Sequence, residues 1–145
     1  MLTDPRLNHA GGGAAAPADG YAFRLAGGPE ACMAARRAVT ACNGTLPAAV
    51  RDDVLLLVTE LVANAVRHAG VGPDQSVRVA LRRSRRFVRV DVIDPGGNFA
   101  RVRPKPITDD PGGWGLVLVE RIAARWGVGH GAPGTCVWFE VEVER

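Results

Sequence analysis

Several residue types and patterns are scarce in this chain of 145 residues, and each absence removes a class of protein. The three cysteines, Cys32, Cys42 and Cys136, lack the spacing of metal ligands and are odd in number. We therefore expect reduced thiols rather than a zinc site or a disulfide framework. No apolar run approaches the roughly 20 residues of a membrane-spanning helix, and the N-terminus does not resemble a signal peptide. These absences predict a cytoplasmic protein with no membrane partner.

Excess charge and a clear nucleic-acid motif are also missing. The net charge of +3 at pH 7 is too small to indicate a nucleic-acid partner by itself. Five residues at 82–86 include four arginines, but no aromatic residues alternate with them to stack on bases. We interpret this cluster as a solvated hairpin tip and expect no direct contact with nucleic acid. The apolar content of 47% is that of a soluble globular chain with one core.

The order of apolar periods and turn residues predicts the fold. Residues 1–20 are rich in Gly, Ala and Pro and predict a disordered leader, followed by one folded domain at 21–145. The expected elements are strands at 21–25, 77–81, 88–92, around 128 and at 135–143, with helices at 30–42, 48–69 and 114–126. This order predicts a two-layer α/β (α+β) fold, in which helices cover one face of a mixed β-sheet.

The helix at 48–69 contains the most informative feature of the sequence. Glu60 and Asn64 lie four residues apart within its most apolar stretch, and therefore on the same helical face. Burying a charge without a partner is costly, so this pair indicates a polar counterpart opposite the helix. That counterpart is either another side chain, in a purely structural pair, or a ligand.

Two strand ends place further polar groups in the same layer. By period-two alternation, Asp94 shares the inward face of Val88, Val90 and Val92. Thr135 shares the inward parity of Val137 and Phe139. Asp94 and Thr135 either satisfy one another and cap turns, or they contribute to a binding site with Glu60 and Asn64.

A glycine-rich segment directly precedes the third predicted helix. Gly112, Gly113 and Gly115 surround Trp114 in this segment. Glycines at a helix start let the backbone approach a phosphate, and the helix N-terminus offers unpaired N–H groups. The segment is neither a Walker A loop, because Gly-Lys-Ser/Thr is absent, nor a Rossmann fingerprint, because no strand leads into it. A flexible loop is the alternative.

In this order, the elements resemble the GHKL superfamily of ATP-binding domains, which have the Bergerat-type fold. The family includes gyrase, histidine kinases, a heat-shock chaperone and a mismatch-repair ATPase, and bacterial anti-sigma-factor serine kinases are the most similar members. The resemblance covers about residues 21–143 and rests on four motifs, beginning at Glu60, Asp94, Gly112 and Gly134.

The resemblance implies a role for each polar residue of the site. Asn64 would bind Mg²⁺, Asp94 would accept a hydrogen bond from the adenine amino group, and Thr135 would support that carboxylate. Glu60 would be the general base that takes the proton from a serine hydroxyl or from water. The implied cofactors are ATP and Mg²⁺.

The remaining implied contacts lie in and beside a lid at about 95–113. Gly96 and Gly97 would form its hinge, and the motif containing Gly113, Gly115 and Leu116 would cradle the phosphates. Two residues depart from the family pattern: Asn98 replaces a usual glycine, and Trp114 stands where a basic or small residue is common. An indole cannot neutralise phosphate charge, so Trp114 bears on triphosphate affinity.

The function implied by the resemblance is that of an anti-sigma regulatory serine kinase. Such a protein transfers the ATP γ-phosphate to a serine of an anti-sigma-factor antagonist and holds a sigma factor in alternate complexes. The resemblance also suggests a homodimer. The rival interpretation is a nucleotide-responsive binding module without catalysis, because only Glu60 points toward chemistry rather than binding.

Overall fold

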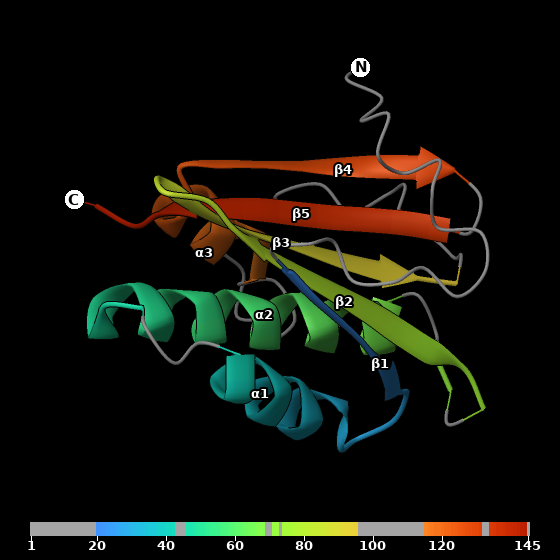
Figure 1. Cartoon of the computed structure of the whole chain (residues 1–145). Coiled ribbons are helices and arrows are strands. Elements are labelled where there is room, and N and C mark those ends of the chain that lie inside the picture. Colours follow the sequence, from blue (N-terminus) through green and yellow to red (C-terminus); the bar gives the residue numbers. More distant parts are fainter. Residues whose placement is uncertain are drawn as a thin grey trace.

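The fold of this protein is an antiparallel sheet with helices packed on one of its faces (Figure 1). The computed structural model describes residues 20–42, 46–68, 71–72, 74–95, 115–131 and 134–144. Strand β1 (Gly20–Ala26) precedes helices α1 (Ala31–Cys42) and α2 (Ala48–His68). A hairpin follows, formed by β2 (Ser76–Arg83) and β3 (Phe87–Asp94). Helix α3 (Gly115–Ile122) leads to β4 (Arg125–Gly131) and β5 (Gly134–Glu142).

The five strands are arranged in the order β1-β2-β3-β5-β4, and each pair of neighbours is antiparallel. The predicted two-layer fold with helices on one face is therefore confirmed, but the sheet is antiparallel rather than mixed. Two helices connect β1 to β2, and β2 returns antiparallel to β1. Among the described residues between β3 and β4, α3 is the helix, and these two strands run in the same direction. They are not neighbours, because β5 pairs with both of them.

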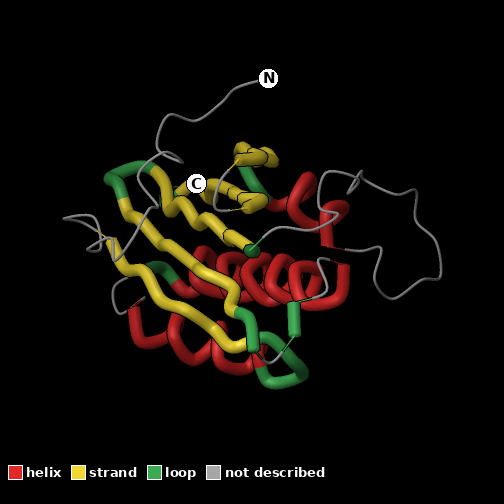
Figure 2. The backbone as a smooth tube through the Cα atoms, turned by 90° about the vertical axis from the view of Figure 1, so that its right-hand side faces the viewer, coloured by secondary structure: helices red, strands yellow, loops and turns green. Residues whose placement is uncertain are grey.

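The core lies between the sheet and the helices (Figure 2). Val77, Val79 and Leu81 of β2 are buried, as their alternation predicted, and so are the corresponding valines of β3. Helix α2 presents a buried apolar stripe to the sheet, made of Val50, Val54, Leu57, Val58, Leu61, Val62 and Ala65. This spacing follows the helical period of 3.6 residues, which explains why this segment is a helix packed on a core.

Helix α1 begins after a turn at Gly28, which has a φ of 108° and accepts a hydrogen bond from the Ala31 N–H. A positive φ of this size favours glycine. Ala31, Ala35 and Val39 then recur every four residues and form its buried side. Helix α1 packs against α2 and β1, and α2 contacts β2, β3, β5 and α3. Helix α2 is therefore the element that joins the other helices to the centre of the sheet.

Two predicted boundaries need correction. The third helix ends at Ile122 rather than Trp126, because the Ala124 N–H donates to the Glu140 carbonyl and the chain joins the sheet at Arg125. Strand β1 begins at Gly20, which was predicted to be the last residue of the leader. The rest of that leader and the lid beyond Pro95 lie outside the described residues. Within the described part of the chain, no helix combines the length and the hydrophobicity needed to cross a membrane.

Candidate nucleotide-binding site

Helix α2 carries two of the predicted site residues, and it exposes them to different degrees. The carboxamide residue Asn64 is only 4% exposed, whereas Glu60 is half-buried. Glu60 lies beside the buried apolar stripe of α2, so its carboxylate is at the border of the core rather than inside it. The prediction that both groups lie in the buried layer holds for Asn64 and is wrong for Glu60.

The ends of two neighbouring strands hold the other two polar residues. Asp94 is the last residue of β3, and Thr135 is the second residue of β5. The two are register partners in the β3–β5 ladder. They are 2% and 5% exposed. Among the described residues, the Oδ2 atom of Asp94 is a buried oxygen without a hydrogen bond, although the Asp94 side chain does have other interactions. The predicted inward direction of both side chains agrees with their burial.

Buried polar residues occur on both faces of the sheet, and only those on the helix face coincide with predicted site residues. The helix-facing layer holds Asn64, Asp94 and Thr135, on α2, β3 and β5. Because α2 contacts both β3 and β5, all three residues lie in the layer between the helices and the sheet, and Asp94 and Thr135 are register partners. Polar groups are expensive to bury, so this accumulation indicates a site rather than ordinary core packing.

The opposite face holds a second buried polar cluster, which the sequence did not reveal. Arg89 donates to Asp91 at 2.8 Å, lies 3.7 Å from Glu140 and stacks 4.2 Å from the Trp138 ring. Arg82 reaches the same aspartate at 3.6 Å. Alternation with Val88, Val90 and Val92 places Arg89 and Asp91 on this face, but their burial depends on strand register, which the sequence does not show. Their charges compensate one another, so this cluster has a structural role.

Helix α3 packs against α2, the helix that carries Asn64. Gly115 and Leu116 form the first turn of α3. The first turn of a helix has N–H groups without intrahelical partners, which are suited to bind phosphate oxygens. Gly96, Gly97 and Gly113, which were predicted to complete the site, lie outside the described residues.

The charge of the Glu60 carboxylate affects the pKa of the Cys32 thiol. Burial raises the pKa of the Cys32 thiol, the Glu60 carboxylate raises it further, and Arg67 lowers it. Cys32 also donates from Sγ to the carbonyl of Thr59 at 3.7 Å. Cys32 on α1 and Thr59 on α2 therefore lie at the contact between these two helices. All three cysteines are free, as predicted.

The donor set of the site fits a metal bound together with phosphates. Within the described residues, no group of three or more His, Cys, Asp or Glu side chains is placed to hold a metal ion. Mg²⁺ is commonly bound by one or two protein oxygens while phosphates and water complete its shell. Asn64 offers one such oxygen in the buried layer. In a magnesium nucleotide, Asn64 would be the residue that holds the metal.

A buried carboxylate and hydroxyl at adjacent strand ends, a buried carboxamide on the covering helix and a third helix packed on that helix are the features expected of an α+β nucleotide-binding domain. Comparison with protein families agrees: the model of the histidine kinase-like ATPase domain matches residues 25–141. The chain belongs to this family, and the predicted GHKL-type ATP-binding domain is confirmed. All of the predicted site residues fall within the matched segment. No curated protein matches the chain.

Proposed function

We propose that this protein is a serine kinase of the anti-sigma regulatory type. It transfers the γ-phosphoryl group of ATP to a serine of an anti-sigma-factor antagonist, and it holds a sigma factor in alternate complexes. The family supports ATP binding, and the motif beginning at Glu60 supports the kinase assignment. The observation that carries the proposal is the contrast between the buried Asn64 and the half-buried Glu60 one helical turn away.

This contrast suits transfer to a protein acceptor. A serine hydroxyl reaches the nucleotide from the protein surface, so the group that takes its proton must be accessible from that side. Glu60 meets this requirement, while Asn64 and Asp94 lie deeper, where they would hold the metal and the base of the nucleotide. Mg²⁺, when bound, would offset the charge of the phosphates.

The proposed reaction is an in-line phosphoryl transfer. The Glu60 carboxylate takes the proton of the serine hydroxyl while the serine oxygen forms a bond to the γ-phosphorus. The bond from that phosphorus to the bridging oxygen breaks, and ADP leaves. With water in place of serine, the same groups give slow ATP hydrolysis, which can be measured without the acceptor protein.

The test is ATP hydrolysis by the purified protein and by Glu60→Gln. We expect the variant to keep its ATP affinity and to lose roughly 10²- to 10⁴-fold in turnover, the usual contribution of a general base. Glu144→Gln is the matched control, because Glu144 is exposed and follows β5 at the end opposite Thr135. Turnover unchanged by Glu60→Gln would show that Glu60 is not the base. Tight ATP binding with no turnover even in the unaltered protein would favour the non-catalytic binding module.

A further inference from the structure

The face of the sheet that points away from the helices is not covered by any described helix (Figures 1 and 2). On each strand, residues of this open face alternate with core residues. Leu25 is buried in the core, so its neighbour Arg24 lies on the open face. Val77 and Val79 are fully buried, so Arg78 between them lies on the open face as well. Arg24 and Arg78 are register partners on β1 and β2, and we call them the arginine pair.

The arginine pair places two positive charges directly opposite one another. Side chains at such positions of an antiparallel ladder have Cβ atoms about 4.5–5.5 Å apart, and like charges at this separation are destabilising. Arg24 is exposed and Arg78 is partly exposed. Neither forms an ion pair or a hydrogen bond with a described residue. The sheet thus carries two adjacent guanidinium groups without a described counter-charge.

Other arginines of the open face have carboxylate partners. Arg82 and Arg89 lie 3.6 and 2.8 Å from Asp91. Arg125 pairs with Glu140 on the neighbouring strand. Each of these guanidinium groups has a carboxylate within the sheet, so the arginine pair is the place on this face where a carboxylate from outside would complete the pattern.

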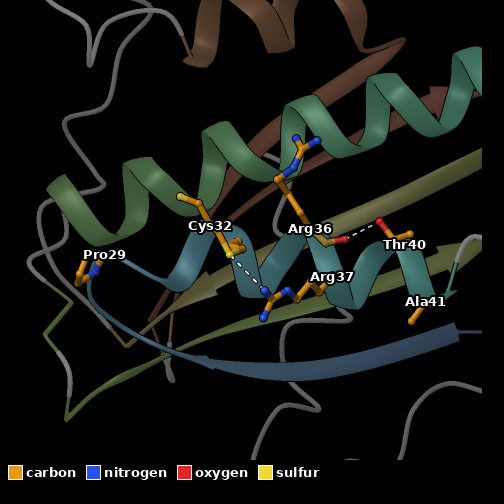
Figure 3. A pocket seen from close by; sticks show the side chains of 7 residues that line it. Pro29, Cys32, Arg36, Arg37, Thr40 and Ala41 are labelled. Atoms are coloured by element: carbon orange, nitrogen blue, oxygen red, sulfur yellow. Dashed lines mark hydrogen bonds between the residues drawn. The ribbon is translucent and has the colours of Figure 1, made fainter.

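Two exposed arginines of helix α1 also contact other side chains. Figure 3 shows Arg36 and Arg37 beside a depression on this helix, with Arg36 extending toward α2. The Nη1 atom of Arg36 donates to the Thr59 hydroxyl at 3.3 Å. The Nη2 atom of Arg37 lies 3.4 Å from the sulfur of Met33. Exposure alone therefore does not deprive an arginine of a side-chain contact, and this distinguishes the arginine pair.

Apolar residues continue the row in which the arginine pair lies. Arg78 is the register partner of Ile93 on β3, and Ile93 is the partner of Cys136 on β5. Ile93 is partly exposed, whereas Cys136 is 1% exposed. Neighbouring strands lie about 4.8 Å apart, so two charges and the apolar surface of Ile93 lie within reach of a few residues of an extended chain.

We propose that the open face of the sheet docks an acidic segment of a partner protein at the arginine pair. Two carboxylates of that segment bind the guanidinium groups of Arg24 and Arg78, and an apolar side chain packs on Ile93. Guanidinium groups bind carboxylates with two parallel hydrogen bonds, and the added negative charge relieves the repulsion within the pair. This inference goes beyond the proposed function and does not depend on it.

Two other occupants of the open face are disfavoured. A single-stranded nucleic acid needs free aromatic faces for its bases, but the Trp138 ring is stacked 4.2 Å from Arg89 and the Phe87 ring 4.7 Å from Arg125. A second copy of the chain, packed through the same face, would bring a second arginine pair rather than carboxylates. An acidic protein segment is the occupant that the charges favour.

The test uses a fluorescent synthetic peptide in which two glutamates and a leucine occupy alternate positions, and therefore one face of an extended chain. A second peptide has glutamine in place of both glutamates. Anisotropy titrations measure the affinity of each peptide for the purified full chain, and calorimetry measures ATP affinity in parallel. We expect the glutamate peptide to bind, the glutamine peptide to bind roughly 10-fold more weakly, and added salt to reduce the difference.

Charge reversal at either member of the arginine pair locates the binding surface. Arg24→Glu and Arg78→Glu each place a carboxylate opposite the remaining arginine, and each should weaken binding of the glutamate peptide roughly 10-fold. Both variants should also unfold at a higher urea concentration than the unaltered protein, because a like-charge pair becomes an opposite-charge pair. The matched control is Arg85→Glu, since Arg85 is exposed in the β2–β3 hairpin and the net charge changes by the same amount. Its peptide affinity and urea midpoint should stay unchanged.

Several outcomes would overturn the inference. No binding of the glutamate peptide, equal binding of both peptides, or full affinity in both reversal variants would refute docking at the arginine pair. A lower urea midpoint in both reversal variants would show that the pair stabilises the sheet and has a structural role instead. An equal loss of affinity in Arg85→Glu would assign peptide binding to the overall charge.

The other two occupants have their own signatures, and each would also overturn the inference. Displacement of the peptide by a DNA oligonucleotide at equal concentration would assign the open face to nucleic acid. Self-association in sedimentation that both reversal variants abolish would assign it to a second copy. Because ATP affinity is measured separately, failure of the docking inference leaves the proposed function standing, and loss of ATP binding in the unaltered protein would refute the proposed function alone.

Discussion

Two buried aspartates on β3 should respond in opposite ways to the same substitution. Asp94 is 2% exposed on the helix face, and Asp91 is 7% exposed on the opposite face. Asparagine has nearly the same volume as aspartate, so neither substitution creates a cavity of the kind that destabilises a core. The effect of each change therefore reports on the charge and its partners alone.

For Asp94→Asn, the expected loss is in ATP affinity. In the proposed site, its carboxylate accepts a hydrogen bond from the adenine amino group, and such a bond to a charged group contributes about 1.5–3 kcal/mol. Losing that contribution weakens ATP binding by roughly 10- to 150-fold. Guanine carries an oxygen acceptor in place of the amino group, so the unaltered protein should also prefer ATP over GTP. Asp94→Asn should reduce this preference.

For Asp91→Asn, the expected loss is in stability. Its carboxylate is held by Arg89 at 2.8 Å and by Arg82 at 3.6 Å. Removing one partner of a buried ion pair commonly costs about 3–5 kcal/mol. Because Arg89 keeps Glu140 at 3.7 Å, we expect a loss near the lower end of this range. ATP affinity should be unchanged.

Calorimetric titration with ATP and GTP, together with urea unfolding of both variants, checks these expectations. Full ATP affinity in folded Asp94→Asn would refute the assignment of the adenine contact. Equal loss of ATP binding in both folded variants would show that the two faces of the sheet are not functionally separate.

Two further predictions concern packing and ionisation. A Cβ atom at Gly127 would lie 2.9 Å from the Trp138 indole, so Gly127→Ala should lower the free energy of unfolding by about 1–3 kcal/mol in urea titrations. Gly72→Ala, which meets no atom within 4 Å, is the control, and equal losses in both variants would contradict the packing argument. Because the Glu60 carboxylate raises the pKa of Cys32, Glu60→Gln should shift the pH profile of Cys32 alkylation to lower pH, as followed by mass mapping. An unchanged profile would show that the carboxylate and the thiol do not interact.

Much of the helix-facing layer could be predicted because it depends on local periodicity. The buried stripe of α2 and the alternation of β2, β3 and β5 follow from residue spacing alone. The same periodicity placed Asn64, Asp94 and Thr135 inward, and all three are buried. Their proposed role in binding a nucleotide comes from the motifs. Burial by itself does not distinguish residues that bind a ligand from residues that only pair with one another.

Features that depend on long-range pairing could not be predicted in the same way. The position of β5 between β3 and β4 makes the sheet antiparallel, and no local signal encodes it. The burial of Arg89 and Asp91 requires the register that brings Glu140 and Trp138 beside them. The end of α3 was misplaced because an apolar segment extends from the helix into β4.

In the proposed function, one site binds ATP together with Mg²⁺ through Asn64. Its most direct test is an ATP titration by calorimetry, with and without Mg²⁺, of the unaltered protein and of Asn64→Ala. Arg51→Ala is the control, because Arg51 lies on the same helix and is exposed. We predict that Mg²⁺ strengthens ATP binding in the unaltered protein and in the control, and that Asn64→Ala abolishes this strengthening. The same magnesium dependence in Asn64→Ala would show that Asn64 does not hold the metal. No ATP binding by the unaltered protein would contradict the proposed nucleotide site itself.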